Sequence, residues 1–365
     1  MTNIQKSDIT FICSGKIFAG KKFNTLASIK SVKKYFPESK IILSTWEGEN
    51  IEPFEKFCDL IILNPCMEMK YHTCLESCSW YPKLNSYDLQ QKSVNAALRQ
   101  CKTKYAVRFR TDFVLKNDNF LKKYIEFENI FDRFVPEYKI FQNKVLIHQT
   151  GTISPYTKDV PMLHHPSELF HFGLTEDLLK IWTGKNMPEK IADYFHDESH
   201  NESNPCLFNH RYTPEQYIWL KMLDDSGVGY EKPDYYLSFS EKMRQEQDRL
   251  FISNFIILDA QGLGISSKFD EKLKHVQHRF YDLETYIKQY QKYIVSTPDK
   301  TLLLNQLTLQ CKIKSYWKKL HKHGDRIAYP LKSALRWFSE IFSFFSYSLK
   351  LISLYLKLFL SKLRF

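Results

Sequence analysis

Short apolar runs alternate with longer amphipathic stretches through the first third of the chain. The apolar runs have the length of strands, and they lie at residues 9–13, 40–43, 59–63 and 104–109. Between them, apolar residues recur at helical spacing over residues 23–35 and predict a helix, and a second helix is predicted over residues 84–101. Strands and helices in alternation are typical of βαβ units, so the pattern predicts an α/β fold with a mainly parallel central sheet.

Strand and helix signals are mixed over residues 140–250. Two further strands are predicted, at residues 144–148 and 169–172. Two helix starts follow. Thr175 resembles an N-cap with acidic residues in the first helical turn, and Thr213, which is followed by proline, resembles another.

The positive charge of the chain lies almost entirely at its C-terminal end. The 365 residues carry a formal net charge of +11, yet residues 312–365 hold twelve basic and two acidic residues, and the remainder holds 40 basic and 39 acidic residues. A nucleic-acid enzyme usually spreads basic residues over its folded face, so we expect no nucleic-acid partner.

The last part of this tail, residues 338–365, is apolar apart from one polar stripe. On a helical wheel, serines fall on the same side as Lys350, Lys357 and Arg364. The pattern predicts C-terminal amphipathic helices that lie in the plane of an anionic membrane surface without spanning it. A helix that packs on the domain or on a second subunit stays open as the alternative, and the sequence does not fix the oligomeric state.

The eight cysteines do not predict disulfides. The first residues, MTNIQKSD, are polar, and a chain of this length needs no disulfide staples, so we expect free thiols in a reducing compartment. With the tail, this predicts a cytoplasmic protein that is peripheral on the inner face of the cytoplasmic membrane. We favour a structural interpretation over a metal site for three groups of potential ligands: Cys66, Cys74, Cys78 and His72; His164 and His165; and His196 and His200.

Ligands of open parallel sheets bind outside the carboxyl ends of the strands. In this sequence those ends are Ser14-Gly15-Lys16, then Ser44-Thr45-Trp46-Glu47, then Arg110-Thr111-Asp112.

The last of these strand ends is the sharpest candidate for a binding site. In an extended strand, Arg108, Arg110 and Asp112 share one face. Asp112 could hold a divalent cation that bridges a diphosphate, or the two arginines could neutralise the diphosphate directly through forked hydrogen bonds. A surface Arg–Asp ion pair without a ligand is the third interpretation.

Three carboxylates are candidates for a general base, which must reach the hydroxyl that it deprotonates: Glu168, Asp177 and Glu215. Helix starts attract acidic residues for other reasons, so a structural role stays open for Asp177 and Glu215. The chain has no Gly-x-Gly-x-x-Gly, P-loop or Gly-x-Ser-x-Gly motif, which argues against dehydrogenases, P-loop kinases and α/β-hydrolases.

Several of these segments together resemble the WavE lipopolysaccharide-synthesis family of bacterial glycosyltransferase-like proteins. The most specific are IILSTWEG at residues 41–48 and RFRTD at residues 108–112. The others are ITFICSG at residues 9–15, TLASIKS at residues 25–31, YFPESK at residues 35–40, SELFHFG at residues 167–173 and PEQY at residues 214–217. The resemblance covers residues 9–225 and does not reach the tail.

The resemblance implies a GT-A-like nucleotide-diphospho-sugar transferase fold over residues 1–310. A nucleotide-binding half would span residues 9–135, an acceptor half residues 140–310, and the basic tail residues 311–365. The nucleotide sugar would bind to the ends of the first two strands together with Gln91, Arg108 and Arg110. Asp112 would stand where this fold class places its metal-binding or diphosphate-binding acid.

Two positions depart from the family pattern. Gln90-Gln91 stands where the family usually has Arg-Gln, and Ser167-Glu168 stands where it often has Ser-Asp. The chain also lacks a full Asp-x-Asp at the strand end. A dependence on Mn²⁺ or Mg²⁺ and a metal-independent mechanism therefore both stay open.

On this basis we expect a glycosyltransferase. It would move a sugar, of hexosyl type, from a nucleotide-sugar donor to a lipopolysaccharide, capsule or other surface-glycan acceptor at the cytoplasmic membrane face. One alternative is a non-catalytic, membrane-associated adaptor of an envelope polysaccharide assembly complex. Another is an enzyme that transfers a phosphoryl-linked group to a glycan.

Overall fold

A computed structural model describes residues 4–66, 87–157, 161–184, 186–196, 210–294 and 297–323. The chain divides into two compact units, Met1–Leu304 and Asn305–Phe365. Helix α11 (Pro298–His323) runs without interruption through position 311, so the predicted start of the tail falls inside a helix. The predicted membrane-surface helix at residues 338–365 lies outside the described residues. Within the described ranges, no helix has the length and apolar character needed to cross a membrane.

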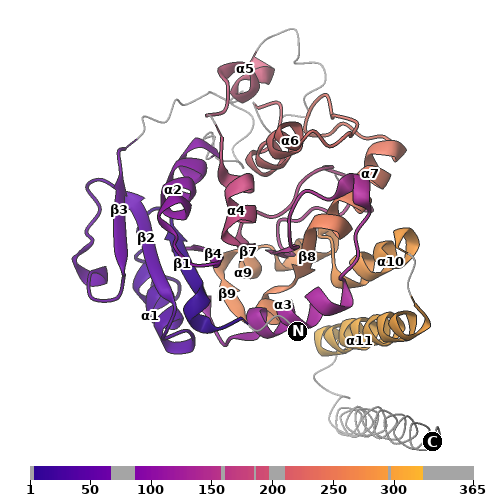
Figure 1. Cartoon of the computed structure of the whole chain (residues 1–365), viewed down its shortest axis with the longest axis horizontal. Coiled ribbons are helices and arrows are strands. Elements are labelled where there is room, and N and C mark those ends of the chain that lie inside the picture. The colour runs from indigo at the N-terminus through magenta and orange to yellow at the C-terminus, as the bar shows by residue number, and fades with distance from the viewer. Residues whose placement is uncertain are drawn as a thin grey trace, which may run out of the picture. The chain divides into compact units, whose positions relative to one another are not determined.

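A seven-stranded sheet forms the centre of the first unit (Figure 1). Its strand order is β3-β2-β1-β4-β7-β6-β8. The four strands β3, β2, β1 and β4 are parallel, β7 runs antiparallel to both of its neighbours, and β8 is parallel to β6. The strands are β1 (Ile9–Ser14), β2 (Lys40–Trp46), β3 (Leu60–Asn64), β4 (Tyr105–Arg110), β6 (Val145–His148), β7 (Phe170–Leu174) and β8 (Phe255–Leu258). The predicted α/β fold with a mainly parallel sheet is confirmed.

The order of the strands places the helices on both faces of the sheet. The chain passes from β1 to β2 in one direction and from β3 to β4 in the other, and right-handed crossovers put α1 (Thr25–Tyr35) and α2 (Tyr87–Gln100) on opposite faces. On the α1 face, the aromatic rings of Phe11, Phe36 and Phe120 pack against one another at the start of α3 (Asn119–Ile130). On the α2 face, α2 packs on β1 and β2 and meets α4 (Thr175–Trp182).

The second half of the unit is mainly helical. Its longer helices are α6 (Pro214–Ser226), α7 (Glu241–Asn254) and α10 (Leu283–Tyr293), and its short ones are α5 (Glu189–Ala192), α8 (Ala260–Leu263) and α9 (Lys268–Lys272).

Short 3-10 turns are spread over both halves of the unit, at Lys6–Asp8, Glu52–Phe54, Pro136–Tyr138, Tyr194–His196 and Lys274–Arg279.

Both predicted helix starts are confirmed, because α4 begins at Thr175 and α6 begins at Pro214. Thr213 caps α6 through a reciprocal pair of hydrogen bonds with Gln216, and Pro214 opens the helix. The acidic residues Glu176 and Asp177 lie in the first turn of α4 as predicted, but the prediction of Thr175 as its N-cap was wrong by one residue. The N-cap of α4 is Leu174, and the Thr175 hydroxyl donates instead to the carbonyl oxygen of Thr103, 2.8 Å away.

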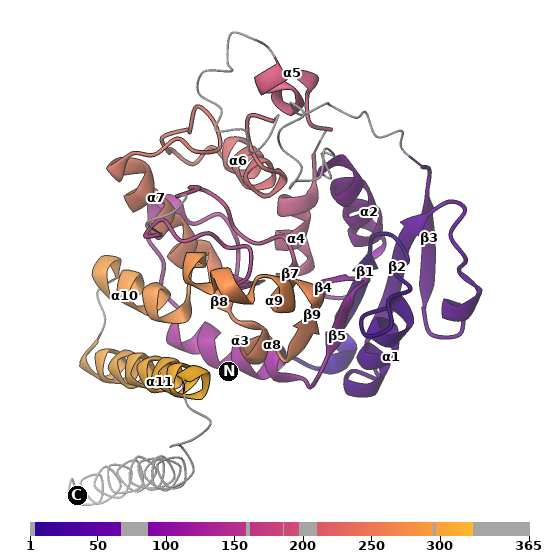
Figure 2. The ribbon, with the colours of Figure 1, turned by 180° about the vertical axis from the view of Figure 1, so that it is seen from behind.

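A separate two-stranded ribbon joins distant parts of the chain. Strand β5 (Phe113–Leu115) follows directly on the end of β4, and it pairs antiparallel with β9 (Ile265–Ser267). Figure 2 shows β9 beside β5, with α9 following it. The ribbon therefore brings residues 265–272 to the carboxyl end of β4.

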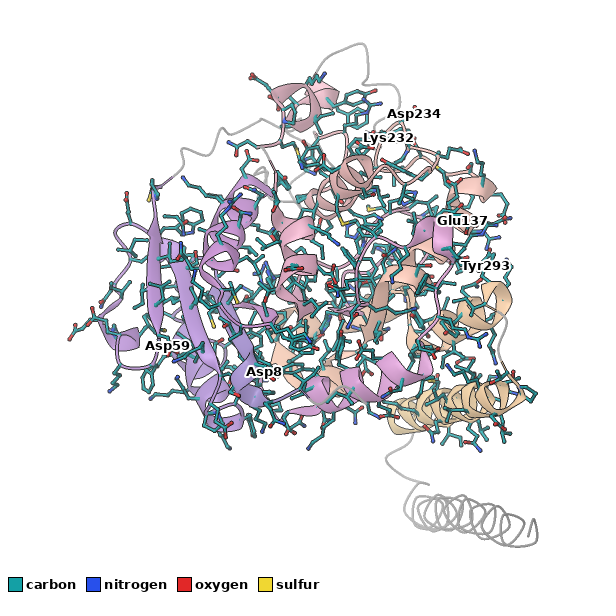
Figure 3. The ribbon with its side chains drawn as sticks, in the orientation of Figure 1. Asp8, Asp59, Glu137, Lys232, Asp234 and Tyr293 are labelled. Carbon is teal, nitrogen blue, oxygen red and sulfur yellow. The ribbon has the colours of Figure 1, made fainter. Side chains whose placement is uncertain are left out.

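The two ends of the parallel strands carry different residues. Asp8 and Asp59, labelled in Figure 3, precede β1 and β3 and mark the amino-terminal edge of the parallel strands. Asp59 is bound there to Lys40 and to the backbone of Ile41. The candidate residues for binding gather at the opposite, carboxyl-terminal edge.

Candidate functional site

The ends of β1 and β4 lie side by side, as the parallel fold predicts. Ser14 is the register partner of Arg110. Beyond the strands, the Thr111 hydroxyl donates to the carbonyl oxygen of Lys16 at 2.8 Å. The Gly15 N–H donates to the carbonyl oxygen of Ser44 at 3.0 Å. Gly15 has a φ of +121°, a conformation that glycine adopts without the steric cost of a side chain. These contacts bring Ser14-Gly15-Lys16 against Arg110-Thr111-Asp112.

Only part of the predicted binding segment at the end of β2 is accessible to a ligand. Ser44 and Thr45 are fully buried, and the Asn64 amide donates to the Ser44 hydroxyl at 2.9 Å and to the Thr45 carbonyl at 2.8 Å. These two side chains lie inside the protein and are not available to a ligand. Trp46 is half-buried and Glu47 is exposed, so only these two predicted residues of the segment can face a nucleotide.

Arg108 is held inside the protein by Glu168. The Arg108 side chain is 2% exposed, and its Nη2 lies 2.9 Å from Glu168 Oε2. Its Nη1 donates to the Leu169 carbonyl at 2.9 Å, and the ring of Trp182 lies 5.3 Å away on one side. Burial lowers the pKa of Arg108 to about 10, and the charge of Glu168 opposes that shift.

Arg110 lies nearer to the surface and faces two carboxylates. Its Nε donates to Asp112 Oδ1 at 3.0 Å, its Nη1 lies 3.8 Å from Glu168 Oε1, and Phe269 stacks on the guanidinium at 4.7 Å. Burial works against the charge of Arg110, but Glu168 and Asp112 outweigh it and raise the pKa of Arg110. Arg108, Arg110 and Asp112 thus share one side of the strand end. The ion pair between Arg110 and Asp112 is largely buried and is not a surface pair.

Asp112 faces a second cation, Lys268 of α9. The Lys268 Nζ lies 3.6 Å from Asp112 Oδ2 and 4.2 Å from the centre of the Phe18 ring. Burial disfavours the charge of Asp112, but Arg110 and Lys268 outweigh it and hold the pKa of Asp112 below its usual range.

These side chains do not fit a divalent cation. Asp112 offers a single carboxylate, and its two oxygens already face Arg110 and Lys268. Within the described ranges, no three His, Cys, Asp or Glu side chains are grouped so that they could bind one metal ion. Mg²⁺ and Mn²⁺ need oxygen ligands, whereas a guanidinium and an ammonium repel them.

The three candidate bases lie in different surroundings. Asp177 lies just after β7, whose register with β4 pairs Leu174 with Tyr105 and so places Asp177 at the amino-terminal edge. There it is fully buried and accepts the N–H groups of Gln142 and Asn143 at 2.9 and 3.0 Å. This position leaves Asp177 outside the site, where it fixes a loop.

Glu168 and Glu215 share one small cavity. It is lined by these two residues, Ser167, His171 and apolar residues, and it has room for about one water molecule. Glu168 is bound to the two arginines, whereas the Glu215 side chain is 26% exposed and lies 3.6 Å from His165 Nε2. His165 is itself fixed by a 2.8 Å hydrogen bond between its Nδ1 and the Gly151 carbonyl.

In the structure the strand end is contacted by Gln90 and not by the predicted Gln91. Gln91 donates to the carbonyls of Gly184 and Trp182, which ties α2 to the end of α4 and keeps Gln91 away from the strand end. Gln90 instead accepts a 3.3 Å hydrogen bond from Arg108 Nη2.

Sequence reasoning missed Lys268, Phe269 and the position of His165. Lys268 and Phe269 are separated from Arg110 by more than 150 residues and carry no motif. His164 and His165 do not converge on one point, because His164 packs on the Tyr230 ring while His165 faces Glu215. The predicted groups that contain His72, Cys74, Cys78 and His200 extend outside the described residues.

Comparison with known protein families gives a match over most of the chain. The family model for WavE lipopolysaccharide synthesis matches residues 9–322. The match therefore continues beyond residue 225 and into the basic tail, so the predicted limit of the resemblance was wrong. No curated protein matches the chain by sequence.

Solved structures show only a distant likeness. The bifunctional IspDF of Campylobacter jejuni is 12% identical, with a TM-score of 0.28 over 50% of this chain and 44% of its own. S. aureus TarS is 14% identical, with a TM-score of 0.30 over 70% and 41%. A cytidylyltransferase from Leptospira borgpetersenii is 11% identical, with a TM-score of 0.29 over 53% and 73%. The chain thus spans less than half of the first two proteins, and these likenesses do not identify a function.

Proposed function

The chain belongs to the WavE lipopolysaccharide synthesis family, and from this premise we propose that it is a glycosyltransferase of surface-glycan synthesis. It would have a GT-A-like fold and move a sugar of hexosyl type from a nucleotide-diphosphate donor to a lipopolysaccharide, capsule or related glycan. One observation supports this most strongly. Arginines, rather than apolar residues, occupy the carboxyl end of β4, at the sheet edge where nucleotides bind in α/β folds.

The arginine cluster suits the leaving group of such a reaction. A nucleoside diphosphate gains negative charge as the bond to the sugar breaks, and fixed cations nearby stabilise that charge. Arg110 is oriented by Asp112, Glu168 and Phe269, so little reorganisation is needed when the diphosphate forms. Arg108, which is fully buried, serves to hold Glu168 in place.

For an inverting reaction we assign the general base to Glu215. A base must reach the acceptor hydroxyl, and Glu215 is partly exposed while Glu168 is enclosed between two guanidinium groups. Glu215→Gln should lower transfer at least 100-fold while the free energy of unfolding changes by less than about 1 kcal/mol. Unchanged turnover in that variant would assign the base elsewhere.

The acceptor side of the proposal depends on the tail. Twelve basic residues lie within residues 312–365, which suits attachment to anionic lipids at the cytoplasmic membrane face, next to a lipid-linked acceptor. Removal of residues 338–365 should release the protein from vesicles that contain anionic lipid and leave its folding transition unchanged. A truncated protein that still sediments with such vesicles would contradict this attachment.

The decisive experiment is a screen of nucleotide sugars with the purified full chain. We expect one of them to raise the melting temperature and to be hydrolysed or transferred, because a ligand that binds only the folded state stabilises it. Arg110→Met should weaken that binding, and Arg99→Met, which removes an exposed arginine from α2, is the matched control. If no nucleotide sugar binds, the non-catalytic adaptor becomes the better explanation.

A further inference from the structure

Positive charge surrounds Asp112 on both sides. Arg110 Nε donates to Oδ1 at 3.0 Å, and Lys268 Nζ lies 3.6 Å from Oδ2. A divalent cation bound to Asp112 would have to break the hydrogen bond with Arg110 and would lie close to two positive charges. A diphosphate, by contrast, would be attracted by the two cations that lie next to the Asp112 carboxylate.

The position of Lys268 follows from strand register. Phe113 in β5, the residue after Asp112, pairs with Ser267 in β9, the residue before Lys268. In an antiparallel pair the neighbours of two register partners are also close, so this pairing places Lys268 beside Asp112.

The segment that carries Lys268 is anchored at several points. Ser267 caps α9, and the Asp270 side chain accepts hydrogen bonds from the hydroxyls of Ser267 at 2.7 Å and Thr150 at 3.0 Å. His148 Nε2 lies 3.3 Å from the same carboxylate, and Glu271 forms an ion pair with Lys22. The segment is therefore fixed beside the strand end, and the Lys268 side chain that it carries is 32% exposed.

We propose that this protein binds the diphosphate of its donor without a divalent cation, and that Lys268 with Arg110 supplies the positive charge. The inference rests on the proposed function, because it concerns the same donor site. Lys268 lies 3.6 Å from Asp112, beyond hydrogen-bond distance, so its three N–H donors can turn to phosphate oxygens. Asp112 then orients the two cations and is not a metal ligand.

The first test measures binding of UDP, CDP, GDP and ADP to the full chain by calorimetry, in EDTA and in Mn²⁺. We expect one nucleoside diphosphate to bind in EDTA with an affinity within about threefold of that in Mn²⁺. Binding only with Mn²⁺ would overturn this inference and leave the proposed function standing. Binding in neither condition would overturn both.

The second test compares the loss of Lys268 with the loss of a control lysine on the same helix. Lys268→Ala should weaken binding of the nucleoside diphosphate in EDTA by about tenfold to a hundredfold, since a hydrogen bond to a charged group is lost, and should leave binding of the matching nucleoside unchanged. Lys272→Ala removes the same charge from an exposed position of the same helix and should have little effect. Equal loss in the two variants, or no loss in Lys268→Ala, would contradict a direct role for Lys268.

Asp112→Asn separates the two possible roles of the carboxylate. If Asp112 only orients cations, its loss leaves the affinity for the diphosphate in EDTA within about threefold or increases it. If Asp112 binds a metal ion, the variant loses the affinity that Mn²⁺ provides. The melting temperature of each variant, measured without ligand, checks that a loss of binding does not come from unfolding.

Discussion

Replacing Glu168 tests whether the arginine cluster has the buried, charge-compensated character described above. Glu168→Ala removes the carboxylate that lies 2.9 Å from Nη2 of Arg108, whose side chain is 2% exposed. The remaining partners are the Leu169 carbonyl and the Gln90 amide oxygen, neither of which carries a charge. The variant therefore leaves a buried cation without its counter-charge.

The expected cost is large for a single substitution. Breaking a buried ion pair by removing one partner costs about 3–5 kcal/mol of the free energy of unfolding. At roughly 2–4 °C per kcal/mol, the melting temperature should fall on the order of 10 °C. Urea unfolding followed by circular dichroism measures the free energy directly. Glu176→Ala, at an exposed position in the first turn of α4, is the control and should change it by less than about 0.5 kcal/mol.

A double-variant cycle identifies the partner. Arg108→Met alone should also destabilise, but Arg108→Met combined with Glu168→Ala should cost at least about 2 kcal/mol less than the two single losses added together. A cost below about 1 kcal/mol for Glu168→Ala, or two losses that simply add, would mean that Arg108 does not depend on Glu168 for its charge compensation.

Three further predictions concern the supports of the site. Thr213→Ala removes the N-cap of α6 and should cost about 0.5–2 kcal/mol in urea unfolding, and Thr213→Ser, which keeps the hydroxyl, should restore most of it. Gly264→Ala, at a φ of +68°, brings a Cβ into contact with Asn117 and should cost at least about 1–3 kcal/mol, whereas alanine at the open position Gly229 should not. Burial lowers the pKa of His164 to about 3, so between pH 6.5 and pH 3 the unfolded chain binds a proton that the folded chain does not, and stability falls as the pH falls. Between pH 7 and pH 5 the free energy of unfolding of the wild type should fall by about 2 kcal/mol more than that of His164→Asn. Asparagine is the substitute because it tolerates the φ of +56° at this position. Equal losses would show that His164 is not buried in its neutral form.

The candidate site was only partly accessible to sequence reasoning. Arg108, Arg110 and Asp112 could be found because they end a hydrophobic strand, and the period of two residues in a strand is a local property. Ser44 and Thr45 also end a strand, yet they are buried beneath Asn64. The choice between Gln90 and Gln91 depended on the rotation of α2 against the sheet, which a run of two identical residues does not reveal.

The sequence by itself determined the alternation of strands and helices, the mainly parallel sheet and the basic strand end, because these follow from hydrophobic periodicity and from residue types within a short segment. Only the tertiary structure decided which acid compensates which arginine, that Asp177 lies at the opposite edge, and that Lys268 lies beside Asp112. Those contacts join segments from about 60 to more than 150 residues apart, and they depend on the antiparallel registers of β7 with β4 and of β9 with β5. A shift of one residue in either register would turn the side chains to the other face. The local pattern constrains such a register only weakly, and the packing of the whole domain fixes it.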